Sequence, residues 1–186
     1  TGQSFKIMAI AINGSGTITG LSSGGAGIAE AEVVSTAALG NHGVIQVVTA
    51  GTTTAVEING TTWTDTGLTA DITPRSNSNK VLVMVRQSLS THRNTTNAYG
   101  SLRLVRASTV IQNTHGTNYH YGIRADGNDH RWWRGAIPFT YLDSPASASS
   151  VTYHVEMAGN SASDSPEYKA QDDNSPSSIV LMEVVA

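Results

Sequence analysis

The stretch TWTDTGLTADITPRSNSNKVLVMVRQSL, residues 62–89, decides the fold that we expect for this chain. Apolar and polar side chains alternate along residues 67–73, and an apolar run follows at residues 80–85. Both segments have the patterning of β-strands, in which successive side chains point to opposite faces. Residues 74–79, PRSNSN, are dense in turn-forming residues. We therefore predict a β-hairpin that opens an antiparallel β-sandwich.

The run KVLVMV at residues 80–85 is apolar on both faces of its predicted strand, and so is SIVLMEVV at residues 178–185. A sandwich core covers only one face of each sheet, so the other face is expected to meet a neighbouring subunit. The residues that we assign to this interface are Leu82, Met84, Leu181 and Val184. Burial of ~500 Å² of apolar area per subunit would contribute on the order of 10 kcal/mol before entropy losses. The chain is therefore predicted to form an oligomer.

Composition narrows the class of protein. Of the 186 residues only 13% are charged and the formal net charge is -3, which gives no reason to expect nucleic acid as a partner. The absence of cysteine excludes disulfides and thiolate chemistry. No apolar run approaches the ~20 residues of a membrane helix, so we expect no membrane insertion.

Two regions are predicted. Residues 1–42 contain two short strands around the turn NGSG at 13–16, and one candidate helix at 28–39. This region cannot bury a core alone, so we interpret it as an anchor and trimerisation segment. Met8 resembles a natural start, and residues 1–7 are expected to be non-native or part of an upstream segment.

Residues 43–186 are predicted to form the sandwich with about eight to ten strands. The expected strands lie at 43–50, 55–58, 67–73, 80–85, 130–142, 151–157 and 178–185, with a tight hairpin at 100–111. Pro138 places the strand at 130–142 near a sheet edge or a bulge. Residues 112–129 and 158–178 are expected to be polar loops.

Residues 115–134 are the densest polar and aromatic region of the chain. We interpret the loop at 114–129 within it as an exposed receptor-binding surface, because function concentrates on loops over rigid scaffolds. The candidate receptor-binding residues are His115, Tyr119, His120, Tyr121, Arg124, Asp126 and Asp129. The alternative is structural: Trp132 or Trp133 alternates into the core, while Arg131 and Arg134 pair with acids across a subunit interface. The second loop, 158–177, either shares the distal tip or is a solvated connector.

Catalytic and metal sites are not expected. His115, His120 and His130 could meet near a trimer axis, but neither their spacing nor a nearby carboxylate pattern supports a metal site. The acid pairs Asp126–Asp129 and Asp172–Asp173 lie in polar loops, and no Gly-x-Ser-x-Gly or His-Glu-x-x-His motif is present. We predict a protein that is not an enzyme and has no cofactor.

Six segments together resemble a module of tailed bacteriophages, especially marine ones, found in tail fibres, spikes and related virion proteins. They are VIQVV (44–48), TTWTDTGLTADITPRSNSNKVLVMV (61–85), GSLRLVRASTVI (100–111), TYLDSP (140–145), VTYHVEM (151–157) and SSIVLMEV (177–184). MAIAINGSGTITGLSSGG (8–25) is similar to the opening of many such phage proteins. The resemblance covers about three-quarters of the chain. It depends on the six segments together, in their order and spacing, because no single segment is specific.

This resemblance implies a jelly-roll β-sandwich that assembles as a homotrimer and carries no catalytic residues. The expected location is the exterior of a phage particle, with residues 1–42 bound to other virion proteins. The sandwich would contact a host-surface glycan or protein. Two alternatives stay open: a capsid decoration or head-fibre protein with a mainly structural role, and a lectin-like module of another secreted assembly.

Overall fold

A computed structural model describes residues 43–93, 97–113, 121–123, 131–160 and 166–186, and the backbone of two short strands at 11–12 and 18–19. The chain divides into two units, Thr1–Gly40 and Asn41–Ala186. In the first, Ala11–Ile12 (β1) pairs antiparallel with Ile18–Thr19 (β2), as the turn between them predicts. The helix predicted at 28–39 lies outside the described residues.

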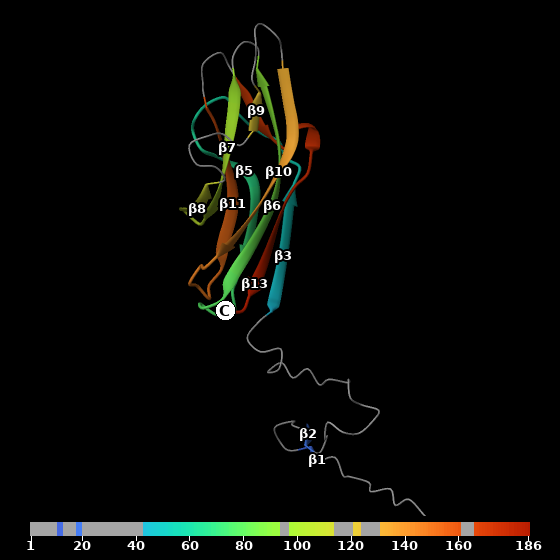
Figure 1. The fold of residues 1–186 in the computed structure, drawn as a ribbon, viewed down its shortest axis with the longest axis vertical. Coiled ribbons are helices and arrows are strands. Elements are labelled where there is room, and N and C mark those ends of the chain that lie inside the picture. Colours follow the sequence, from blue (N-terminus) through green and yellow to red (C-terminus); the bar gives the residue numbers. More distant parts are fainter. Residues whose placement is uncertain are drawn as a thin grey trace, which may run out of the picture. The chain divides into compact units, whose positions relative to one another are not determined.

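The second unit contains two antiparallel sheets (Figure 1). The first sheet is built on the long strand Lys80–Arg93 (β6). Along one side, the first half of β6 pairs with Ser177–Val184 (β13) and the second half with Glu167–Ala170 (β12). Along the other side, Arg131–Asp143 (β10) pairs with the whole of β6. Two further strands complete the sheet, Val44–Thr52 (β3) beside β13 and Val56–Ile58 (β4) beside β12.

The second sheet has Val151–Gly159 (β11) between two neighbours, Thr64–Ile72 (β5) and Ala98–Arg106 (β7). The far side of β7 pairs with Thr109–Asn113 (β8) near one end and with Tyr121–Ile123 (β9) near the other. The tight hairpin predicted at 100–111 is present as β7 and β8, and Ala107 in its turn has a φ of 52°.

The strand orders β3-β13-β6-β10 and β5-β11-β7-β8 show that the chain repeatedly crosses between the two sheets. That wrapping is the arrangement of a jelly roll. The predicted all-β, jelly-roll-like antiparallel sandwich is therefore confirmed. Strands β9 and β12 lie within the stretches that were predicted as loops, and the only helix in the described residues is a 3₁₀ turn, Asp172–Asn174 (η1).

The predicted hairpin between β5 and β6 is wrong, although both strands exist. β5 pairs with β11 in one sheet and β6 with β13 and β10 in the other, so residues 73–79 carry the chain across the sandwich. The buried carboxylate of Glu183 on β13 holds this connection, because it accepts hydrogen bonds from the backbone N of Arg75 (2.7 Å) and from Nδ2 of Asn79 (2.6 Å). Sheets pack about 10 Å apart, a gap that a connection of this length spans.

The core lies between the sheets and follows strand alternation. On β6 the side chains of Val81, Val83 and Val85 are at most 4% exposed, while Met84 between them is 41% exposed. The opposite sheet contributes Leu68, Leu102 and other buried side chains. The alternation that defined the strands in the sequence therefore also sets which face is interior.

Candidate functional site

The outer face of the first sheet carries an apolar row that crosses four strands. The strand register places Val47 of β3 opposite Met182 of β13, Met182 opposite Leu82 of β6, and Leu82 opposite Leu142 of β10. Val47 is 54% exposed and Leu142 is 49% exposed. The neighbouring rows add Val180 and Met84, which lie beside Thr49 and Thr140, and Val44 and Val184, which lie beside Lys80. We call the whole set the apolar face: Val44, Val47, Leu82, Met84, Leu142, Val180, Met182 and Val184.

Three of the four predicted interface residues, Leu82, Met84 and Val184, lie on the apolar face. The assignment of Leu181 to that interface is wrong, because its side chain is 0% exposed and belongs to the core between the sheets. Leu181 and Val184 are three residues apart, and an odd spacing along a strand puts two side chains on opposite faces. The outward apolar residues of β13 are Val180, Met182 and Val184.

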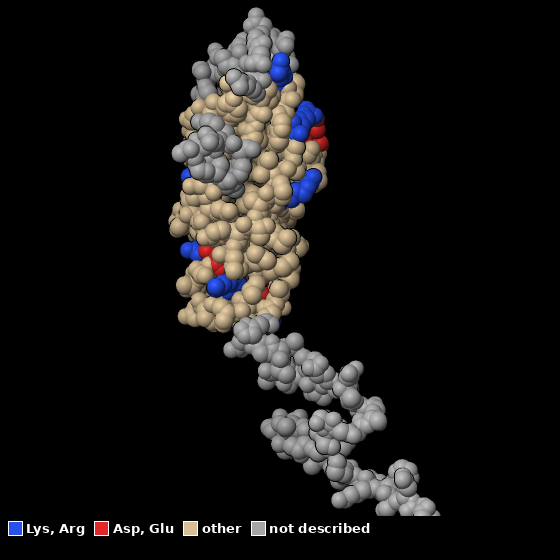
Figure 2. Space-filling view, viewed as in Figure 1, with Lys and Arg blue, Asp and Glu red and all other residues tan. Residues whose placement is uncertain are grey.

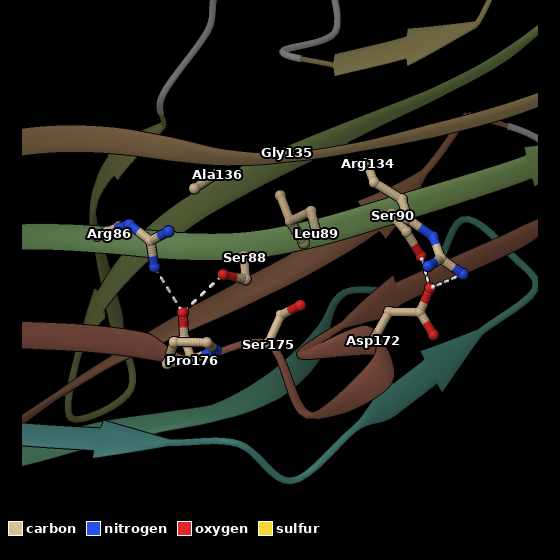
Figure 3. A pocket seen from close by; sticks show the side chains of 10 residues that line it. All are labelled: Arg86, Ser88, Leu89, Ser90, Arg134, Gly135, Ala136, Asp172, Ser175 and Pro176. Carbon is tan, nitrogen blue, oxygen red and sulfur yellow. Dashed lines mark hydrogen bonds and ion pairs between the residues drawn. The ribbon is translucent and has the colours of Figure 1, made fainter.

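Farther along β6 the same outer face contains a polar hollow of about 300 Å³, which we call the groove. Its lining comes from β6, β10 and the loop that precedes β13 (Figure 3). The lining residues are Arg86, Ser88, Leu89, Ser90, Arg134, Gly135, Ala136, Asp172, Ser175 and Pro176. The groove therefore joins three segments that are distant in the sequence and presents guanidinium, carboxylate and hydroxyl groups.

Arg134 and Asp172 face each other at one end of the groove (Figure 3). The Nη2 atom of Arg134 lies 3.2 Å from Oδ2 of Asp172, and the same oxygen accepts a hydrogen bond of 2.8 Å from the hydroxyl of Ser90. Arg134 also pairs with Asp173, and its guanidinium carbon lies 5.2 Å from the ring centroid of Trp132. These contacts hold Arg134 in one place while leaving its side chain 53% exposed.

Arg86 and Ser88 form the other end of the groove. The Nη1 atom of Arg86 donates to the carbonyl oxygen of Pro176 at 2.7 Å, and the hydroxyl of Ser88 donates to the same oxygen at 2.6 Å. No carboxylate in the described part of the chain pairs with Arg86. Since a guanidinium carries five N–H donors, the one bond to Pro176 leaves most of them for water or a ligand.

The loop that forms one wall of the groove has an unusual backbone. Gln171, Asp173 and Asn174 have φ values of 53°, 52° and 59°, in the left-handed region, which aspartate and asparagine adopt more readily than glutamine does. The buried side chain of Gln171 holds the loop in place. Its amide nitrogen donates to the carbonyl oxygen of Thr66 (3.0 Å). Its amide oxygen accepts hydrogen bonds from Nε2 of Gln87 (2.7 Å) and from the hydroxyl of Ser177 (2.9 Å). The wall is thus fixed from the interior of the sandwich.

The predicted receptor-binding surface can be placed only in part. His115, Tyr119, His120, Arg124, Asp126 and Asp129 lie outside the described residues. Tyr121, on β9, is only 5% exposed, so its assignment to an exposed surface is corrected. Its ring stacks on Trp133 with centroids 5.2 Å apart and occupies space that a side chain at Gly100 would fill. Burial raises the pKa of the Tyr121 phenol.

Strand alternation separates the two tryptophans, as the structural alternative predicted. Trp133 packs against the core, whereas Trp132 is 51% exposed on the outer face. Trp132 stacks on His92 with ring centroids 4.1 Å apart and an interplanar angle of 23°. Arg134 pairs with acids, but both belong to its own chain and need no second subunit.

Other kinds of site can be assessed for the described residues only. They contain no group of three or more His, Cys, Asp or Glu side chains placed to hold a metal ion, and the histidines considered above, at 115, 120 and 130, lie outside them. No helix among them is long and apolar enough for a bilayer span.

Comparisons with known proteins show only distant similarity. No protein-family model matches the chain, and the search of curated proteins gives no significant match. Among solved structures, the chain is similar to infectious bursal disease virus of the Gx strain (TM-score 0.35) and to a T13 particle of that virus (TM-score 0.36). The chain is also similar to a mutant VP2 protein of infectious bursal disease virus in derived T=1 particles (TM-score 0.32).

Each of these matches has 9% sequence identity and covers 77% of this chain. This chain spans only 39%, 36% and 37% of the respective viral chains. Similarity at this level carries no argument about function, which must come from the residues themselves.

Proposed function

We propose that this chain is a non-enzymatic bacteriophage virion protein of the tail-fibre or spike type, which assembles as a homotrimer on the particle exterior. The six sequence segments that resemble phage fibre modules support the phage origin. The observation that carries the proposal is the apolar face, because soluble monomeric proteins rarely expose an apolar patch of this extent to water. Only 13% of the residues are charged, and the described part of the face drawn in Figure 2 is mostly tan, which is consistent with extensive contacts between proteins.

The apolar face is suited to bind a second copy of the chain. Its central row, from Val47 to Leu142, spans the sheet from one edge strand to the other, and no charged residue interrupts it. At ~25 cal/mol per Å², several hundred Å² of such area outweighs the cost of association only when it is well packed. A face of this breadth supplies that area, as a single exposed side chain does not.

In this proposal residues 1–42 attach the trimer to other virion proteins, and the sandwich contacts a host-surface receptor, with a glycan as the preferred class. Neither a cofactor nor a membrane segment takes part.

The assembly is tested by placing two carboxylates in the central row, as Leu82→Asp with Leu142→Asp. Burying four to six unpaired carboxylates in one interface is strongly unfavourable, so the double variant is expected to sediment as a folded single subunit. The matched control is Val110→Asp. Val110 is also an exposed apolar residue (38%), but it lies on β8 in the other sheet. Sedimentation velocity and native mass spectrometry measure the three proteins.

A wild-type chain that remains a well-folded single subunit at micromolar concentration would refute the trimer. Receptor binding is tested separately by adding purified wild-type protein to phage and host cells. Competition with adsorption supports an adhesive role, whereas assembly without competition assigns the chain to capsid decoration or a head fibre.

A further inference from the structure

We propose that the groove between β6, β10 and the loop 171–176 binds an anionic oligosaccharide, whose acid group pairs with Arg86. The inference rests on the proposed function, because it names the class of receptor for a virion surface protein. It assigns that contact to the side of the sandwich instead of the loop at 114–129.

The acid-binding group is Arg86. Its side chain is exposed and donates a hydrogen bond of 2.7 Å to the carbonyl oxygen of Pro176. That bond orients the guanidinium and leaves donors for the bidentate contact that arginine makes with a carboxylate or a sulfate. The lining contains Arg86, Arg134 and Asp172, and Arg134 also pairs with Asp173. Among the described residues that line the groove, the positive charge left without a carboxylate partner is therefore that of Arg86.

The hydroxyl-binding groups lie on the opposite end. Asp172 uses Oδ2 for its contacts with both Ser90 and Arg134, so Oδ1 is directed to neither of them. A carboxylate oxygen paired with an arginine is a strong acceptor for a sugar hydroxyl. The Arg86 and Ser90 positions are four residues apart on β6, or about 14 Å. A ligand that reaches both ends must therefore be longer than a single sugar.

Trp132 extends the site beyond Arg134. Its half-exposed ring rests on His92 and has the Arg134 guanidinium near its face. The exposed part of a ring held between these groups offers apolar contact to a sugar, with the polar groups of Arg134 beside it. Arg86 lies on β6, and Arg134 and Trp132 lie on β10 opposite Ser90 and His92, so the three side chains follow one another along the two strands. An extended chain of sugars fits this linear arrangement better than a compact anion does.

The backbone of the groove wall is a second, independent indication. Three left-handed residues within 171–174 are held there by a buried network that includes Gln87 and Ser177. Aspartate and asparagine adopt this conformation readily, so the strained position is Gln171. Backbone strain of this kind is retained mostly at functional sites, where it fixes side chains in a required position. Here it fixes Asp172 and the carbonyl of Pro176, which orient the two arginines.

The test is titration calorimetry on the full chain with three probes of equal length: a uronic-acid oligosaccharide, a sulfated one and a neutral one. Saturable binding of an acidic probe, with the neutral probe at least tenfold weaker, is expected. The two acidic probes identify which acid the groove takes, and binding of either supports the proposal.

Three variants locate the site. Arg86→Gln and Trp132→Ala are each expected to weaken binding by about tenfold or more. Arg75→Gln, which removes an exposed arginine from the connection between β5 and β6, should leave affinity unchanged. Circular dichroism and the oligomeric state verify that each variant keeps the wild-type fold and assembly.

The proposal is overturned if no acidic probe binds, if the neutral probe binds as tightly, or if Arg86→Gln binds like wild type. In each of those cases the protein could still compete with phage adsorption through another surface. That result would leave the proposed virion role standing and remove only the groove.

Discussion

The two outer faces of the sandwich differ sharply, although both belong to twisted antiparallel sheets of similar size. On the face of β5, β11 and β7, polar side chains pair across strands: the hydroxyl of Thr152 donates to Asp71 (2.5 Å), and Arg103 pairs with Glu156 (2.5 Å). On the face of β3, β13, β6 and β10, the corresponding central positions hold Val47, Met182, Leu82 and Leu142.

This difference shows that the fold does not by itself determine which outer face stays in water. In both sheets the outward side chains alternate along each strand with side chains that enter the shared core. Packing of the core therefore does not require the outward side chains to be apolar. One face satisfies its polar groups within the chain, and Arg103 also lies 4.4 Å from the ring centroid of Trp63. The other face has apolar groups whose burial requires a partner.

The largest expected effect is the difference in stability between variants at a core-facing and an outward-facing position of β13. Leu181→Ala should lower the free energy of unfolding by about 2–5 kcal/mol, because it leaves a cavity in the core. Met182→Ala, one residue along and on the apolar face, should lower it by no more than about 1 kcal/mol. Both are measured by urea unfolding in the Leu82→Asp, Leu142→Asp background, so that subunit association does not contribute. Equal losses would mean that the two faces of β13 are not distinct.

An intermediate effect concerns Tyr153, whose hydroxyl donates to Asp143 at 2.7 Å and thereby joins the two sheets. Burial, followed by this hydrogen bond, raises the pKa of Tyr153. The folded chain therefore holds the phenolic proton more tightly than the unfolded chain, whose tyrosines titrate near pH 10. The stabilisation is complete below about pH 10 and is lost as the pH rises above it.

Tyr153→Phe should cost about 1–2 kcal/mol at pH 7 and should make the decline above pH 10 shallower. Tyr121, whose pKa burial also raises, remains in this variant, so the decline is reduced and not abolished. Urea unfolding between pH 8 and pH 11.5 measures both effects. An unchanged alkaline slope would show that Tyr153 does not control it.

The smallest effect belongs to the polar face. Glu156→Gln removes the ion pair with Arg103, whose partners are both partly exposed, and should cost about 0.5–1 kcal/mol. Because salt screens such pairs, the difference from wild type should shrink at 1 M NaCl. The oligomeric state should be the same as in wild type, and a change in it would place this face in the subunit interface.

Much of the fold follows from local sequence patterns. The apolar run at 80–85 located the start of β6, which continues to Arg93, and alternation located the strand at 151–157. The strand predicted at 43–50 is β3, and Pro138, which predicted an edge or a bulge, lies in an edge strand. The pairing of β5 with β6 could not be read from the sequence, because a turn-rich segment of six residues serves equally for a hairpin and for a crossing between sheets. Leu181 was assigned wrongly although residue parity alone separates it from Val184.

The groove could not be found from the sequence because its ends come from β6, β10 and the loop 171–176, which only the folded sheet brings together. The burial of Tyr121 had a possible sequence signal in Gly100. A glycine within a strand often marks the place where another group approaches closely, and a Cβ at Gly100 would come within 2.1 Å of the Tyr121 ring. The partner ring could not have been identified without the structure.

Pro138 has a consequence for how copies of this chain can grow into larger structures. It lies in the middle of β10, the outermost strand on that side of its sheet, directly opposite Arg86. Proline has no N–H to offer a further strand, so that border is a poor template for adding chains without limit. Contacts across the apolar face can close into a finite oligomer, whereas this edge strand lacks the backbone donor that an extending β-ribbon needs at Pro138.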